Sequence, residues 1–366
     1  MSDEQKYGIQ GLDEYIRQEE PQQRERSEAW KVAIGLQQVD RLQTSEYLLE
    51  TAKRHIEGDI SIDEAKQLID SYYKSASGRK VVEGDRTEEA DKVSARIAAV
   101  LAEKAFTFSP TQYLSIHQRL FEGIYSHAGR IRDYNITKNE WVLDGDTVLY
   151  GGATELRATL EYDLSQEKEF NYAGLTMQEV IRHLARFISR LWQIHVFGEG
   201  NTRTTAVFFI KYLRSLGFDV TNDIFAKNAW YFRNAMVRAN YTNLQKGVHE
   251  TTEYLEVFLR NLLLGENTPL HNRDMHISGI LHSDKASADL INGPINDPIN
   301  DPIKLTEREK QLLRLLRESP ELTRKVLAEK LRCSDSTVKR ELQLLSEKGV
   351  LRRIGSKKTG VWVINR

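Results

Sequence analysis

The densest group of chemically capable residues in the sequence lies between His195 and Arg203. This stretch reads HVFGEGNTR, so it combines a histidine, an acid, two glycines, an amide and a guanidinium within nine positions. A histidine can act as a general base near neutral pH. The carboxylate of Glu199 is a ligand that Mg²⁺ accepts together with substrate phosphates. The stretch therefore predicts a site for a metal-bound phosphate with the base His195 beside it.

The two glycines and the residues after them indicate how a phosphate is held. Gly198 to Gly200 form a Gly-x-Gly turn, and we expect a helix to begin near Asn201 or Thr202. Backbone N–H groups at a helix start are unpaired and carry partial positive charge, so they attract an anion. Arg203 can reach the same anion with its planar fork. Each feature alone is more often structural, but their joint occurrence favours a phosphate site.

Apolar residues on both sides of this stretch predict two helices that position it. The upstream residues at helical intervals are Val180, Leu184, Phe187, Ile188 and Leu191. The downstream residues are Val207, Phe208, Ile210 and Leu213. Phe197 is apolar among polar neighbours, so we expect it to anchor the intervening loop in the core.

Composition excludes several classes of protein. A chain of 366 residues, 40% apolar and 29% charged, predicts a soluble globular protein with two or three domains. No apolar run approaches the roughly 20 residues that span a bilayer, and the polar N-terminus is unlike a signal peptide. Cys333 is the single cysteine, which excludes an intrachain disulfide and a cysteine-based zinc site. We therefore expect a cytoplasmic protein without a membrane partner.

The chain divides at its breakers and at a shift in charge. Residues 304–366 hold 17 Lys and Arg against 8 Asp and Glu, a net of +9, so the overall charge of −1 leaves −10 on the rest. This asymmetry indicates a basic module on an acidic body. Tandem INDP repeats mark a flexible linker before that module. The predicted divisions are a helical region at 1–75, a central domain at 76–264, the linker at 265–303 and a C-terminal domain at 304–366.

Local signals predict the elements within these divisions. Ser45 and Gly58 bound one helix, and Ser61 with Glu64 forms a capping box for the next. Helices dominate again at about 88–127 and from Ala153 to about 264. Between them, β-branched and aromatic residues alternate around Asp-Gly-Asp, which predicts a β-hairpin. We call residues 137–150 of that segment the flap.

The stretch HVFGEGNTRTTA, residues 195–206, resembles the signature of the Fic family, His-x-Phe-x-(Asp/Glu)-Gly-Asn-(Gly/Lys)-Arg-x-x-Arg. The family places this signature between two helices with a hairpin flap upstream, and the resemblance covers about residues 90–262. It implies a mainly α fold, a helical bundle with a β-hairpin flap. It also implies transfer of AMP from ATP, with Mg²⁺, to a Tyr, Thr or Ser hydroxyl of a target protein, including the chain itself.

The resemblance also implies roles for single residues. His195 would deprotonate the target hydroxyl, and Glu199 would hold Mg²⁺ on the phosphates. The residues that would bind the nucleotide are Phe197, Gly198, Gly200, Asn201, Thr202 and Arg203. The flap would hold the target as an added strand, through Thr137, Lys138, Val148 and Tyr150.

Two departures from the signature concern nucleotide specificity and regulation. Thr202 stands where the family has Gly, and Ala206 stands where it has a second Arg that contacts the distal phosphate. In regulated members that Arg pairs with a glutamate of an inhibitory helix carrying Ser/Thr-x-x-x-Glu-Gly/Asn. Glu57 is the candidate inhibitory residue here, although Lys53 replaces the Ser or Thr. Residues 1–75 are thus antitoxin-like in layout, and a separate antitoxin and a homodimer stay open.

Two other functions remain open at this point. Members of the Doc branch carry Asn-Lys-Arg-Thr and act as protein kinases, and NTRTTA lies partway toward them. Alternatively, the protein is a DNA-binding transcriptional regulator whose Fic core senses a nucleotide with little catalysis.

The C-terminal domain resembles a winged helix-turn-helix, with three helices and a two-stranded wing. Such a domain can serve protein contacts, but its net charge of +9 favours nucleic acid. The residues expected to meet DNA are Ser336, Thr337, Lys339 and Arg340 on the third helix and Arg352, Arg353, Lys357 and Lys358 on the wing.

Overall fold

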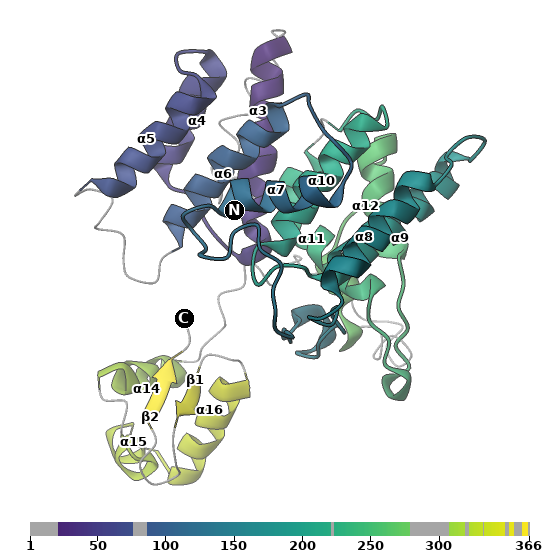
Figure 1. Cartoon of the computed structure of the whole chain (residues 1–366). Coiled ribbons are helices and arrows are strands. Elements are labelled where there is room, and N and C mark those ends of the chain that lie inside the picture. The colour runs from purple at the N-terminus through teal and green to yellow at the C-terminus, as the bar shows by residue number, and fades with distance from the viewer. Residues whose placement is uncertain are drawn as a thin grey trace. The chain divides into compact units, whose positions relative to one another are not determined.

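A computed structural model gives the arrangement of the chain (Figure 1). It describes residues 21–75, 86–220, 223–278, 307–318, 322–331, 333–347, 351–354 and 361–364. The chain splits into two compact units, 1–291 and 292–366, and each has its own apolar core. The described part of the first unit is helical, so the fold is mainly α, as predicted.

The first unit builds its helices in two groups around the candidate loop. Before the loop come α3 (Pro21–Gly35), the 3-10 helix η1 (Leu36–Asp40), α4 (Glu46–Glu57), α5 (Ile62–Lys74), α6 (Thr87–Ala102), α7 (Pro110–Phe121), η3 (Trp141–Leu143), α8 (Leu156–Glu169) and α9 (Met177–Ile194). After it come α10 (Asn201–Ser215), α11 (Ile224–Ala239), η4 (Leu244–Lys246), α12 (Glu253–Leu264) and η5 (Asn272–Met275).

The predicted caps of α4 and α5 are confirmed. The hydroxyl of Ser45 accepts a hydrogen bond from Leu48 N at the start of α4, and Gly58 ends that helix with a φ of 90°. Ser61 and Glu64 form the capping box at the start of α5. These helix ends can be predicted from the sequence because the capping side chains lie only three residues from the backbone groups that they bond.

The N-terminal helices share one core with the central helices. α3 packs along α6 and also contacts α11 (Figure 1). Trp30 and Ala33 of α3 are fully buried, and the close approach of α11 leaves no space for a side chain at Gly35. A Cβ at Gly35 would lie 2.1 Å from the carbonyl oxygen of Ala226. Residues 21–75 therefore belong to the same compact unit as the candidate loop.

The predicted β-hairpin at the flap is wrong. Residues 137–150 form no strand, and their tip is the 3-10 helix η3 followed by a turn. Glu140 N donates to Asp146 O at 2.9 Å, so the two arms still run back on each other. Val142 and Leu143 at the tip are fully buried. Burial of both consecutive residues departs from the alternation of a half-exposed hairpin strand, in which neighbours point to opposite faces.

Part of the predicted linker is folded. Met275 is fully buried, and Tyr254 donates its hydroxyl hydrogen to Asp274 O at 2.7 Å. Asn234 of α11 donates to the side chain of Asn272 at 2.9 Å. Residues 265–278 therefore return onto α11 and α12, which corrects the expectation of a flexible segment from 265. The rest of the predicted linker lies outside the described residues.

The second unit has the elements of a winged helix-turn-helix. Its helices are α14 (Glu307–Glu318), α15 (Arg324–Lys330) and α16 (Asp335–Glu347), and its strands are β1 (Leu351–Ile354) and β2 (Val361–Ile364). The two strands pair antiparallel, with Leu351 opposite Ile364. Leu312, Leu327 and Val338 from the three helices are fully buried together.

Candidate active site

Helices α9 and α10 hold the candidate loop between them, as the sequence predicted. α9 begins at a capping box formed by Thr176 and Glu179 and ends at His195. His195 has a φ of 51°, and Gly200 has a φ of 74° where α10 begins. The apolar residues predicted on both helices are buried, so the core fixes both ends of the loop.

Asn201 shapes the loop by bonding twice to Phe197. The backbone N–H of Phe197 donates to Asn201 Oδ1 at 2.9 Å, and Asn201 Nδ2 donates to Phe197 O at 2.7 Å. The Phe197 ring is fully buried and stacks on His117, with centroids 3.6 Å apart. Phe197 is therefore the predicted core anchor, and the Asn201 amide closes the turn.

His117 supports the loop from α7, a role that the sequence did not indicate. Gly129 N donates to His117 Nδ1 at 2.8 Å, so the ring carries its hydrogen on Nε2, which donates to Glu199 O at 3.0 Å. Burial lowers the pKa of His117 to about 3, which keeps the ring neutral. The only sequence signal for this role is a histidine within an otherwise apolar helix face.

The Phe121 ring packs beneath Gly200 and explains why a glycine is needed there. A Cβ at Gly200 would lie 2.4 Å from the Phe121 ring. The positive φ of Gly200 also disfavours any L side chain. Gly198 is confined on the other side, where a Cβ would lie 2.5 Å from the hydroxyl oxygen of Tyr134. The backbone of the loop is thus shaped for close approach.

His195 is held in the tautomer of a base. Its Nδ1 lies 3.3 Å from Trp192 O, and because a carbonyl only accepts, Nδ1 carries the hydrogen. Nε2 is left with its lone pair and is a buried atom without a hydrogen-bond partner. Burial, followed by the charge of Lys138, lowers the pKa of His195 well below its ordinary value. The ring of Tyr150 covers it, with centroids 4.3 Å apart.

Arg132 clamps the end of α9, and the sequence did not single it out. Its Nε donates to His195 O at 2.7 Å, and its Nη2 donates to Gly151 O at 2.6 Å. It also donates to the carbonyl of Tyr134. The guanidinium is buried and satisfies carbonyls at the negative end of the helix, where a cation is favourable. Arg132 therefore fixes His195 relative to the segment that leads into the flap.

Glu199 and Lys138 face each other at the open side of the loop. Glu199 is 53% exposed, and its Oε2 lies 3.6 Å from Lys138 Nζ. The part of the chain that the structure describes contains no cluster of three or more His, Cys, Asp or Glu that could hold a metal ion. A single carboxylate fits Mg²⁺ that takes its remaining ligands from phosphates and water.

The flap points only some of the predicted residues outward. Thr137 is exposed, whereas Val148 and Tyr150 are buried. Leu149 between them is 84% exposed, so it is the apolar flap residue that faces solvent. The alternation of Val148, Leu149 and Tyr150 was the signal that could have identified it. Tyr150 instead donates to Glu140 Oε1 at 2.8 Å beneath the flap.

Arg203 points into the protein and is fully buried. Its Nη2 lies 2.6 Å from Glu89 Oε1 and 2.7 Å from Asp40 Oδ2. Its Nη1 donates to Gln37 Oε1 at 3.0 Å. The structure thus places the predicted phosphate-binding arginine on acids from η1 and α6. Ala206, the position of the missing second arginine, is also fully buried.

Two further predictions from the sequence concern the regions around Arg203. Glu57 is exposed at the end of α4, which packs on α3 and α5. The acids that reach Arg203 are instead Asp40 and Glu89.

Thr202 is buried, and its Oγ1 accepts a hydrogen bond from Trp192 Nε1 at 3.0 Å. The hydroxyl that replaces the family's glycine therefore ties α10 to the end of α9.

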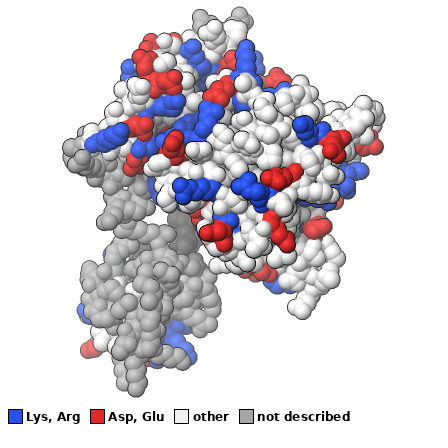
Figure 2. All heavy atoms as spheres, in the orientation of Figure 1, with Lys and Arg blue, Asp and Glu red and all other residues white. Residues whose placement is uncertain are grey.

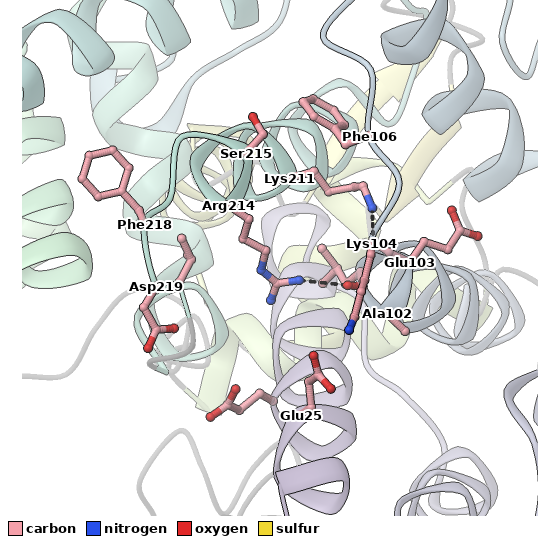
Figure 3. Close-up of a pocket in the computed structure, with 13 residues that line it drawn as sticks. Glu25, Ala102, Glu103, Lys104, Phe106, Lys211, Arg214, Ser215, Phe218 and Asp219 are labelled. Carbon is pink, nitrogen blue, oxygen red and sulfur yellow. Dashed lines mark hydrogen bonds between the residues drawn. The ribbon is translucent and has the colours of Figure 1, made fainter. Parts of the chain in front are cut away.

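A cavity of about 330 Å³ lies at the carboxyl end of α6 (Figure 3). Two cations of α10 point into it from one wall. Lys211 donates to Val100 O at 3.0 Å and to Glu103 O at 2.6 Å, and Arg214 donates to Leu101 O at 2.8 Å. Val100 and Leu101 lie in the last turn of α6, where carbonyls lack partners within the helix, and Glu103 directly follows that turn. Both cations therefore stabilise the carboxyl end of α6.

The face of the first unit seen in Figure 2 carries no large patch of a single sign of charge, because Lys and Arg are mixed with Asp and Glu there.

The described residues of the second unit include two of the predicted DNA contacts on its third helix. Lys339 and Arg340 are exposed on α16. Thr337 N donates to Ser334 Oγ at 3.2 Å, so Thr337 lies in the cap of that helix. The side chains of Ser336, Arg352 and Arg353 lie outside the described residues, as do all atoms of Lys357 and Lys358.

No helix in the described ranges is long and apolar enough to span a membrane.

Family models match a part of each unit. Residues 107–213 match the Fic/DOC family, and residues 308–361 match an HTH domain. In structure, the chain is similar to a Fic family protein from Desulfovibrio desulfuricans G20, with a TM-score of 0.41 and 13% identity over 98% of this chain and 93% of that chain. No curated protein matches the chain in sequence. The chain therefore carries a Fic/DOC family domain that holds the candidate loop, and an HTH domain follows it.

Proposed function

We propose that the Fic/DOC domain transfers AMP from ATP to a hydroxyl side chain of a protein. The hydroxyl oxygen attacks the α-phosphorus, the bond from that phosphorus to the bridging oxygen breaks, and pyrophosphate leaves with the electron pair. The hydroxyl proton passes to Nε2 of His195. The family match supports transfer of a phosphate-containing group, and the choice of AMP rests on the resemblance of the loop.

The state of His195 is the observation that carries this proposal. Its Nε2 has a free lone pair, and the lowered pKa keeps the ring neutral at physiological pH. A neutral imidazole at the end of α9 and beside the start of α10 can accept a proton where a phosphate anion binds. Because Nε2 is buried beneath Tyr150, the target hydroxyl reaches it once that side of the flap moves.

The remaining loop residues would hold the nucleotide. Glu199 is the residue that would hold Mg²⁺, which supplies positive charge to the phosphates when bound. The glycines 198 and 200 would let the backbone approach the phosphates closely. The exposed Thr137 and Leu149 of the flap are placed to contact an extended target segment.

Labelled nucleotides test the reaction directly. We expect label from α-³²P-ATP with Mg²⁺ to appear on the protein itself or on a protein of a cell lysate. The variant His195→Ala should lose about 10²- to 10⁴-fold of the rate, which is the usual contribution of a general base. His195→Asn is a matched control for folding, because Asn adopts the positive φ more readily than Ala. Unchanged labelling by both variants would show that His195 is not the base.

The same experiment separates AMP transfer from the kinase alternative. Label from γ-³²P-ATP, without label from α-³²P-ATP, would show phosphoryl transfer of the Doc type. Parallel loss of both labels in His195→Ala would still identify the site, since both reactions need a base for the hydroxyl.

A second candidate function is a DNA-binding regulator whose Fic/DOC domain senses a nucleotide with little catalysis. The HTH domain suggests DNA binding, and the engagement of Arg203 by Asp40 and Glu89 favours weak phosphate contacts at the loop. This function predicts DNA binding that depends on added ATP, with no covalent label from either labelled ATP. Covalent labelling would contradict it.

A further inference from the structure

The Fic signature has two arginines, at the positions of Arg203 and Ala206 here, and neither position offers a free positive charge to a bound nucleotide. Arg203 is fully buried, and its two terminal nitrogens contact Asp40, Glu89 and Gln37, while its Nε, also buried, has no hydrogen-bond partner among the described residues. Ala206 provides no charge at the position of the second arginine. A phosphate that bound Arg203 would leave Asp40 without its cation and Glu89 with Arg86 alone, which is unfavourable. Apart from Mg²⁺, positive charge for the phosphates therefore has to come from another side chain.

Two other arginines near the loop are also committed to partners. Arg132 is bound to the carbonyls of His195, Gly151 and Tyr134. Arg233 lies 2.7 Å from the fully buried carboxylate of Glu140, beneath the flap. Removing either arginine from these partners would leave buried acceptors unpaired. Neither is available to an incoming anion.

Lys138 differs from these arginines in position and in partners. Its side chain is 29% exposed, and its Nζ lies 3.6 Å from Glu199 Oε2, which is itself exposed. Its backbone N–H donates to Thr147 Oγ1 at 3.3 Å, so the opposite arm of the flap holds it in place. The charge of Lys138 also acts on His195 and contributes, after burial, to its lowered pKa. The ammonium thus faces Glu199, and its charge also acts on the base at the other end of the loop.

We propose that Lys138 supplies the positive charge that binds the nucleotide phosphates in this protein, in the place of the absent and the committed arginines. This inference rests on the proposed function, because it assumes that the loop binds a nucleotide. It assigns Lys138 to nucleotide binding, whereas the resemblance to the Fic family implied that Lys138 contacts the target protein. The pair with Glu199 is exposed and weak, so an anion can replace the carboxylate as the partner of Lys138 at little cost.

Binding of ATP without metal distinguishes a phosphate-binding role of Lys138 from a purely structural role of its ion pair with Glu199. We expect Lys138→Gln to weaken ATP binding in EDTA by roughly 10- to 100-fold, the usual effect of a charge-assisted contact. Glu199→Gln breaks the same ion pair but removes a negative charge, so it should leave ATP binding unchanged or strengthen it. If the pair only stabilises the loop, both variants should weaken binding equally, which would overturn the inference.

Controls separate charge from shape and from the proposed function. Lys138→Arg should retain most of the ATP affinity, and Lys246→Gln, a lysine 3.8 Å from Asp146 of the flap, should retain all of it. Binding of adenosine, measured by competition, should be the same in Lys138→Gln and the wild type. Equal ATP binding by Lys138→Gln and the wild type would overturn this inference alone, and a higher KM for the target would return Lys138 to the target side. A wild type that binds no ATP would overturn the proposed function as well.

Discussion

The Arg203 guanidinium lies 2.7 Å from the Asp40 carboxylate, and this contact joins the candidate loop to the N-terminal helices. Glu89 of α6 approaches the same nitrogen from another side, and Phe121 lies beneath the guanidinium at 4.8 Å from its ring centroid. An arginine of the loop is thus part of the core that the N-terminal segment completes. Its replacement should therefore affect folding before it affects chemistry.

Removal of the Arg203 charge should destabilise the protein. We expect Arg203→Met to lower the free energy of unfolding by about 3 kcal/mol, because Glu89 and Asp40 then lose a buried cation. Arg203→Lys keeps the charge and should lose less. Urea unfolding followed by circular dichroism measures both. Arg86 also lies 2.7 Å from Glu89. A loss below about 1 kcal/mol for Arg203→Met would show that solvent or Arg86 compensates the carboxylates.

The Thr202 hydroxyl should contribute to stability through Trp192. Thr202→Val keeps the shape but removes the acceptor of a buried indole N–H, which costs about 1–3 kcal/mol. Thr202→Ser keeps the acceptor and is the matched control. Urea denaturation of the two variants gives the comparison. Equal stability of the Val and Ser variants would mean that the indole N–H finds another partner.

Three buried histidines should make the protein sensitive to acid. Burial lowers the pKa of His55 to about 4 and of His117 to about 3, and it lowers the pKa of His195 well below 6.5. Below pH 6.5 the unfolded chain takes up protons that the folded protein excludes, so stability is lost as pH falls toward about 4. Each histidine should lower the free energy of unfolding by about 1.4 kcal/mol per pH unit.

Urea titrations at pH 7.5, 6.0 and 5.0, at constant ionic strength, measure this slope. His117→Gln should remove the contribution of one proton from the slope, although it also loses the bond to Glu199 O. A slope that is the same in the variant and the wild type would show that His117 is already protonated in the folded protein.

The HTH domain should bind DNA with a strong dependence on salt. Lys339 and Arg340 are exposed on α16, whereas Val338 and Leu342 on the same helix are buried. Replacing Lys339 and Arg340 by Ala should weaken binding and reduce the slope of log K against log salt by about 2 without unfolding the helix. A salt titration of DNA binding by the full chain measures this. No binding at low salt would favour an interaction or dimerisation domain instead.

The local structure around the candidate loop followed from the sequence alone. The apolar periods of α9 and α10, the caps at Ser45 and Ser61 and the anchor Phe197 were all predicted correctly. Each depends on groups a few residues apart, whose geometry is set by the helix itself. The order of residues in the loop also indicated the Fic/DOC domain, whose family model matches residues 107–213.

The tertiary structure decided the partners that come from distant parts of the chain. Arg203 was expected to face a phosphate, but Asp40 and Glu89, far from it in sequence, place it in the core. Contacts over long sequence distances also determine the tip of the flap, where Val142 and Leu143 are buried in a 3-10 helix, and the role of His117. Periodicity and capping signals predict where a helix lies and which of its faces is buried. Which distant residues pack against that face depends on how the whole core packs.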